Sequence, residues 1–137
     1  MSMSAPATIV VGYVPTPEGL AAVEYAVDEA QRGQARLVIV NSGVRGYDSD
    51  PSFASATDLD ALADRLTGLG IEHEIRQATQ AISPAEEILQ AATDVSADLI
   101  VIGLRKRSPV GKLFLGSSSQ QVILDAACPV VAVKRPD

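Results

Sequence analysis

Five short apolar runs, separated by polar and amphipathic segments, divide the chain. They cover residues 8–14, 37–40, 71–76, 99–102 and 130–133. Four of them are apolar at nearly every position, which is typical of strands buried on both faces of a parallel sheet. The third run alternates instead, and one of its faces carries Ile71, His73 and Ile75. This alternation predicts an edge strand with its charged face toward water.

The amphipathic segments between these runs predict four helices. Thr16 is a predicted N-cap with Pro17 at the first helical position, and Gly33 ends this first helix. Its buried face is expected to carry Leu20, Val23, Ala26, Val27 and Ala30. The second helix has a stripe made of Leu59, Leu62, Ala63 and Leu66. The third opens on a capping box over residues 83–86, and the last is expected over residues 117–127.

The regular alternation of strands and helices predicts an α/β protein, in which a parallel sheet has helices on both faces. Sheets of this kind bind ligands beyond the carboxyl ends of their strands, where the strand order reverses. If the first and fourth runs are central neighbours, the turn after Val14 and the loop after Gly103 flank this point. Asn41 and Ser42, at the end of the second run, then also belong to the site.

Length, charge and cysteine content narrow the class of protein. We expect a single domain over residues 1–137, with residues 1–6 disordered and residues 43–53 forming a flexible loop. The formal net charge of −6 argues against nucleic-acid binding. No apolar run approaches the roughly 18 residues of a membrane-spanning helix, so no membrane partner is expected. The single cysteine allows no internal disulfide, which favours a cytoplasmic location.

A cluster of cations stands out against this acidic background. Four of the eleven basic residues fall at positions 105, 106, 107 and 112. The cluster lies between Gly103, where an apolar run ends, and a predicted helix start formed by Gly116, Ser117, Ser118 and Ser119. Glycine admits close backbone approach, and the free amides and dipole of a helix start favour an anion. These features predict a phosphate site, with a solvated surface loop and a simple helix cap as the alternatives.

The same residues resemble a known family. Within IVIGLRKRSPVGKLFLGSSSQQVILDAACPVVAVK, Gly103 is followed after twelve residues by Gly116 and Ser117, which is similar to the pattern of the universal stress protein family. The resemblance covers nearly the whole chain. It implies a doubly wound, Rossmann-like α/β fold with five parallel strands in the order 3-2-1-4-5 and helices on both faces. It also implies a homodimer that binds ATP or AMP.

Two positions depart from the family's nucleotide-binding pattern, which is glycine, two residues, glycine, nine residues, then glycine and serine or threonine. Lys106 stands at the middle glycine, where it either crowds the phosphates or adds a compensating positive charge. Val14 stands where many members carry an aspartate, so the resemblance gives only weak support for Mg²⁺. Backbone contacts at Gly12 and Val14 do not depend on side chains, and the resemblance implies adenine near Ser42 and Ile102.

The last apolar run predicts an interface with a second copy of the chain. Val130, Val131 and Val133 make this run apolar without alternation, and the strand order puts it at a sheet edge. A long apolar edge invites pairing with another strand, so we predict a two-fold homodimer formed through it. The alternative is that another element of the same chain covers this edge.

No catalytic or metal-binding constellation is predicted. His73 is the only histidine and shares a face with two isoleucines, and the serines at 117–119 have no general base near them in the sequence. The leading hypothesis is therefore a dimeric, nucleotide-dependent regulator in the stress response that acts on an unidentified protein partner. Two alternatives remain open. One is a dimeric interaction module that does not use nucleotide, and the other is a slow ATPase, which needs a metal and a positioned water.

Overall fold

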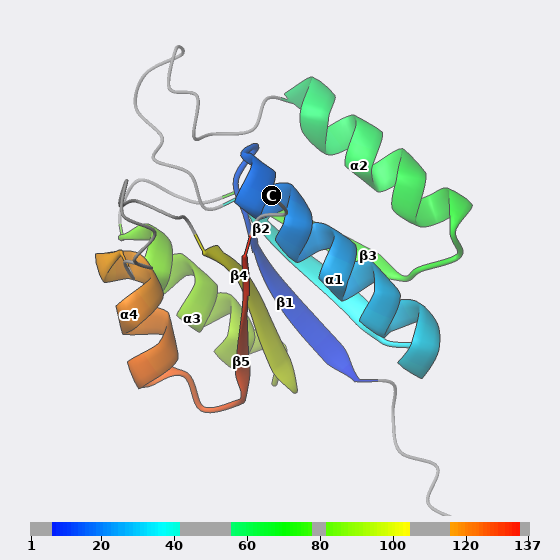
Figure 1. Cartoon of the computed structure of the whole chain (residues 1–137). Coiled ribbons are helices and arrows are strands. Elements are labelled where there is room, and N and C mark those ends of the chain that lie inside the picture. Colours follow the sequence, from blue (N-terminus) through cyan, green and yellow to red (C-terminus); the bar gives the residue numbers. More distant parts are fainter. Residues whose placement is uncertain (1–6, 42–55, 78–81, 105–115, 135–137) are drawn as a thin grey trace, which may run out of the picture.

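Five parallel strands form one sheet in the order β3-β2-β1-β4-β5 (Figure 1). Their bounds are Thr8–Tyr13 for β1, Arg36–Asn41 for β2, His73–Gln77 for β3, Leu99–Leu104 for β4 and Val130–Lys134 for β5. In the centre of the sheet, Ile9 of β1 pairs with Leu37 on one side and with Leu99 on the other. The predicted order 3-2-1-4-5 is confirmed, and the first and fourth strands are central neighbours.

The computed structural model describes residues 7–41, 56–77, 82–104 and 116–134. The predictions made for residues 1–6 and 43–53 lie outside these described residues. The helices run over Pro17–Gly33 for α1, Ala56–Gly68 for α2, Pro84–Asp94 for α3 and Ser117–Asp125 for α4. Within the described ranges, no helix combines the length and apolar character needed to cross a membrane.

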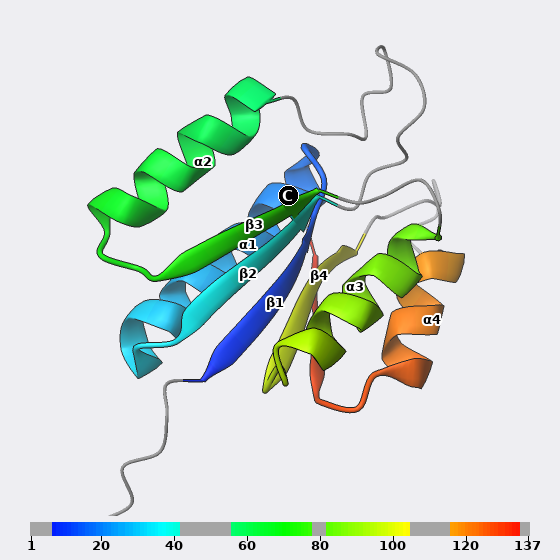
Figure 2. The same cartoon turned by 180° about the vertical axis from the view of Figure 1, so that it is seen from behind.

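The helices form two layers, one on each face of the sheet. Figures 1 and 2 show α1 and α2 on one face, with α3 and α4 on the other. Alternate side chains of β1 pack against the two helix layers. Ile9 and Val11 pack in the core beneath α1 and α2, whereas Val10 packs with Ile88 of α3 in the second core. Every residue of β1 is buried, which explains why its sequence is apolar without alternation.

The predicted helix starts are confirmed by their capping hydrogen bonds. Thr16 Oγ1 accepts from the Gly19 amide at 3.1 Å, and Ser83 Oγ accepts from the Glu86 amide at 3.2 Å. In both helices a proline follows the cap. Because these signals lie within four consecutive residues, the sequence alone locates the starts of α1 and α3.

Several local predictions were wrong. The edge strand begins at His73 rather than at residue 71, and the last helix ends at Asp125 rather than at residue 127. The predicted end of α1 at Gly33 is confirmed, and the residue that follows it, Gln34, is left-handed with φ 56°. Leu20 is 52% exposed, because Glu18 and Gly19 take the inward positions of the first turn of α1.

Candidate functional site

The carboxyl ends of β1 and β4 meet at the middle of one sheet edge, as the strand order requires. A Cβ atom added to Gly12 would lie 3.4 Å from Cγ2 of Ile102 and 2.6 Å from Cδ1 of Ile88. Gly12 therefore lies directly against the end of β4 and beneath α3. Two of the predicted site residues, Gly12 and Ile102, are brought together on the face of the sheet that carries α3 and α4.

The first turn of α1 packs against two further predicted site residues. A Cβ atom added to Gly103 would collide with the carbonyl group of Glu18, and one added to Gly19 would collide with the carbonyl oxygen of Val14. The sequence suggested that Gly103 lets the backbone approach a ligand. The structure gives it another reason, because the side-chain position of Gly103 is occupied by the backbone of α1. Strand β4 also continues one residue beyond Gly103, to Leu104.

The start of α4 carries the four remaining described residues of the predicted site, Gly116, Ser117, Ser118 and Ser119. Gly116 is the N-cap and provides no side-chain hydrogen bond. The first helical bond runs from the Gln120 amide to the Gly116 carbonyl at 3.0 Å. The amides of the three serines therefore precede the hydrogen-bonded ladder of the helix. Ser117 and Ser118 are exposed and Ser119 is half-buried.

The start of α4 differs from the other helix starts in the charge of its first turn. The first turns of α1, α2 and α3 contain Glu18, Asp58, and Glu86 with Glu87, respectively. Among the four helices that the structure describes, only α4 has no acidic residue in its first turn. An acidic side chain at a helix start offsets the positive end of the helix dipole. The start of α4 therefore keeps its positive end, and its first amides have no helical acceptor, so both favour an anion.

The start of α4 lies at the same end of the molecule as the carboxyl ends of the strands (Figures 1 and 2). Eight of the ten predicted nucleotide-site residues thus lie at the end of the molecule where the strands have their carboxyl ends. They are Gly12, Val14, Ile102, Gly103, Gly116, Ser117, Ser118 and Ser119. The other two, Ser42 and Lys106, lie outside the described residues, as do the cations at positions 105, 107 and 112.

Asn41 was expected to belong to this site, but it faces the other layer. It alternates with Ile39 on β2 and is fully buried, and its Nδ2 donates to Oε1 of Gln77 at 3.2 Å. Its register partner on β1 is Tyr13. Burial, reinforced by the charge of Asp58, raises the pKa of Tyr13 above its usual value of 10.0. Asn41 and Tyr13 are therefore buried on the face of the sheet that α1 and α2 cover. Gly12 and Ile102 lie on the opposite face.

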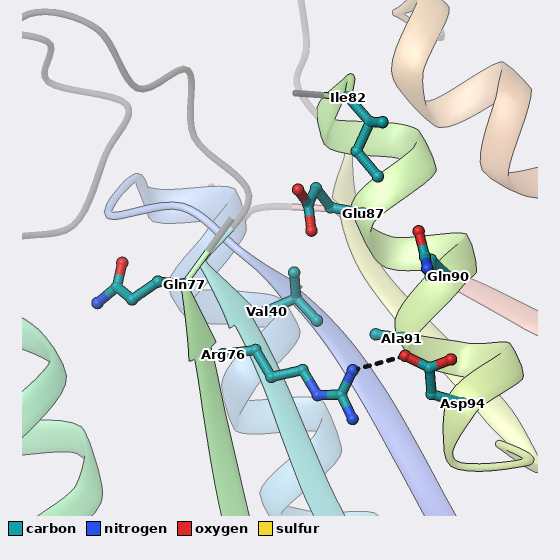
Figure 3. A pocket seen from close by; sticks show the side chains of 8 residues that line it. All are labelled: Val40, Arg76, Gln77, Ile82, Glu87, Gln90, Ala91 and Asp94. Atoms are coloured by element: carbon teal, nitrogen blue, oxygen red, sulfur yellow. Dashed lines mark hydrogen bonds and ion pairs between the residues drawn. The ribbon is translucent and has the colours of Figure 1, made fainter. Parts of the chain in front are cut away.

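A polar groove that the sequence did not predict lies between α3 and the β2–β3 half of the sheet (Figure 3). Its volume is about 560 Å³, and its lining includes Val40, Gln77 and Glu87. Arg76 spans it, with Nη1 3.0 Å from Asp94 and Nε 2.6 Å from Glu74. The hydrogen bonds to Glu74 and Asp94 raise the pKa of Arg76. Because both carboxylates already neutralise this guanidinium, the described lining of the groove offers no free cation for a phosphate.

The two edges of the sheet differ in chemistry. Strand β5 forms one edge, and its residues Val130, Val131 and Val133 are half-buried. Strand β3 forms the other edge and carries Glu74 and Arg76. The prediction that the last apolar run lies at a sheet edge is confirmed.

Cys128 lies just before β5, at the end of the sheet opposite to the candidate site. Burial, together with the charge of Asp98, raises the pKa of the Cys128 thiol, so this cysteine is held in its unreactive protonated form. In the described parts of the chain, no three His, Cys, Asp or Glu side chains come together as metal ligands would. The chemistry that this edge supports is the binding of an anion by amides and hydroxyls.

Comparisons with known proteins agree with this geometry. The sequence model of the universal stress protein family matches residues 7–134. A universal stress protein of Mycolicibacterium smegmatis is 40% identical over 126 residues, which make up 92% of this chain and 96% of that protein. The match therefore extends over almost the full length of both proteins.

Solved structures share the arrangement of the elements. A universal stress protein from Archaeoglobus fulgidus in complex with dAMP is 25% identical, with a TM-score of 0.70 over 96% of this chain and 100% of that chain. A protein of the same family from Arabidopsis thaliana with AMP bound is 18% identical, with a TM-score of 0.67 over 96% of this chain and 93% of that one. The second likeness supports the fold alone.

Proposed function

The chain belongs to the universal stress protein family, and we propose that it binds an adenine nucleotide, AMP or ATP, with the phosphate at the start of α4. The observation that carries this proposal is the exposed, acid-free start of that helix, where Ser117 and Ser118 present amides and hydroxyls. An anion there gains hydrogen bonds from groups that have no helical partner, together with the favourable helix dipole.

Relatives of the same fold support the choice of ligand. The Archaeoglobus fulgidus and Arabidopsis thaliana proteins carry dAMP and AMP. In this chain the nucleotide would lie along the carboxyl ends of the strands, with adenine near Ser42 and Ile102 and the phosphate at Gly116–Ser119. Lys106 would add positive charge, which strengthens hydrogen bonds to phosphate.

We propose binding with slow turnover at most. Val14 provides no carboxylate after β1, and the described residues contain no cluster of potential metal ligands. Hydrolysis of ATP needs a metal ion and a positioned water, so Mg²⁺ has only weak support here. The protein would act in the cytoplasm as a nucleotide-dependent regulator in the stress response, with nucleotide occupancy changing the surface that it offers to a protein partner.

We propose further that two chains pair through β5. Its apolar residues Val130, Val131 and Val133 leave a strand edge that a second copy can extend through backbone hydrogen bonds and apolar contacts. The opposite edge, at β3, carries charges that discourage such pairing. This asymmetry between the two edges supports β5 as the interface of a two-fold dimer.

Substitution at Ser118 tests the phosphate site. Ser118→Asp places a carboxylate in the first turn of α4, where it stabilises the helix but repels phosphate. Ser118→Asn is the matched neutral control of nearly the same shape. Isothermal titration with AMP should show Ser118→Asp binding at least about tenfold more weakly than Ser118→Asn, because a like charge within a few ångströms costs at least that much.

The same titration separates binding failure from misfolding. Because an acidic residue at this position favours the helix, the urea midpoint of Ser118→Asp should equal or exceed that of Ser118→Asn. Equal AMP affinities of the two variants would contradict the phosphate site. If the wild-type protein, shown by mass spectrometry to be free of nucleotide, took up no AMP, the nucleotide-independent interaction module would be favoured instead.

A further inference from the structure

The groove between α3 and the β2–β3 half of the sheet has no part in the proposed nucleotide site. Its volume of about 560 Å³ falls within the range of small-molecule sites, which is roughly 300–1,000 Å³. Val40 of β2 and Ala91 of α3, both almost fully buried, give it an apolar floor. Polar side chains of β3 and α3 form its two walls (Figure 3). An apolar floor between polar walls is the usual construction of a ligand site.

The charges along the groove do not balance. Arg76 is the only basic residue of its described lining, whereas Glu87 and Asp94 are acidic. Glu74, beside the groove, also accepts a hydrogen bond from Arg76. Three carboxylates against one guanidinium leave two negative charges in excess among these described residues. The groove therefore favours a positively charged occupant.

The spacing of two of the carboxylates restricts the kind of cation. Glu87 and Asp94 are seven residues apart on α3, so they lie on one face of the helix, about 10 Å apart along its axis. Figure 3 shows Gln90 at a level between them. One metal ion cannot reach both, because its bonds to oxygen are about 2.0–2.6 Å long. A ligand that uses both carboxylates needs two positive charges held apart by a linker.

We infer that this groove is a binding site for a linear aliphatic polyamine. Eight bonds separate the terminal nitrogens of spermidine, which gives a span of about 10 Å when the chain is extended. One terminal ammonium group donates to Glu87, and the other donates to Asp94, which it shares with Arg76. The methylene groups lie over Val40 and Ala91, as the stem of a lysine lies on apolar surface. This site does not depend on the proposed nucleotide site.

An NMR titration of the nucleotide-free, ¹⁵N-labelled full chain with spermidine tests the site. We expect saturable changes in amide chemical shift that are concentrated in residues 74–77 and 87–94. Two diamines of equal charge test the span. 1,7-Diaminoheptane should bind at least about threefold more tightly than 1,3-diaminopropane, which is too short to reach both carboxylates. Equal affinities of the two diamines, or no saturable shift at these residues, would overturn the inference.

Removing either carboxylate tests the contacts. Glu87→Gln and Asp94→Asn should each weaken spermidine binding by about threefold or more, the loss of one ion pair at a partly exposed site. Asp28→Asn is the matched control, because it removes the same charge from an exposed position on α1, in the other helix layer. It should bind spermidine as the wild-type protein does. An equal loss in Asp28→Asn would mean that net charge alone attracts the amine, which also overturns the site.

A substitution of opposite sign completes the test. Arg76→Gln removes the cation that competes for Asp94, so it should tighten spermidine binding by about threefold. Arg65→Gln is its control, since Arg65 pairs with Glu24 in the other helix layer. If the groove were only structural, Arg76→Gln would lower the urea midpoint and leave the spermidine affinity no higher than in Arg65→Gln. That result would contradict the polyamine site.

Discussion

At Gly103 the missing side chain makes room for the backbone of α1 rather than for a ligand. The sequence predicted a functional glycine here because an apolar run ends on it. Its packing partner, Glu18, lies far away in the chain, and no local pattern reveals that contact. The position of Gly103 at a strand end could be read from the sequence, whereas its contact with α1 had to come from the structure.

Adding one methyl group at Gly103 tests this explanation. Gly103→Ala should lower the free energy of unfolding by about 1–3 kcal/mol, because the new Cβ would overlap the Glu18 carbonyl group and α1 must shift. Gly68→Ala is the control, since a Cβ there meets nothing within 4 Å. It should stabilise the protein by about 0.4–1 kcal/mol through the unfolded chain. Urea unfolding measures the free energy of unfolding of both variants. A Gly103→Ala variant as stable as the wild-type protein would contradict the packing argument.

Helices and strands were predicted best where their signals are local. Thr16 and Ser83 mark helix starts because each caps an amide three residues later. Element ends were less predictable: α1 ends at Gly33 as expected, whereas α4 ends at Asp125 rather than at residue 127. The strand β5 was also predicted from its apolar sequence. This edge strand carries no charged residue before Lys134.

Charge substitution at β5 tests the proposed dimer. Val131→Lys puts a charge in the middle of this edge strand, where lysine disfavours strand pairing. Sedimentation velocity should show a dimer for wild-type protein and a monomer for this variant. Ile75→Lys is the matched control, because Ile75 is likewise half-buried in an edge strand and packs against the same core as Val131. It should remain dimeric, and a dimeric Val131→Lys would rule out the β5 interface.

In the whole molecule, residues far apart in the sequence meet at the carboxyl ends of the strands. The predicted strand order was enough to expect this. Once the first and fourth strands were neighbours, Gly12, Val14, Ile102 and Gly103 had to meet at the carboxyl edge. The groove crossed by Arg76 was not predictable, because it depends on how far α3 extends over the β2–β3 half of the sheet. The predictions for Ser42 and Lys106 remain untested because these residues lie outside the described part of the chain.

The central claim is that the start of α4 holds the phosphate of an adenine nucleotide. The most direct measurement is a pair of titrations of nucleotide-free wild-type protein, one with AMP and one with adenosine. The account predicts saturable binding of AMP that weakens with salt, and at least about tenfold weaker binding of adenosine, which has no charge for the amides to hold. Adenosine binding as tightly as AMP, or no binding of either, would contradict it.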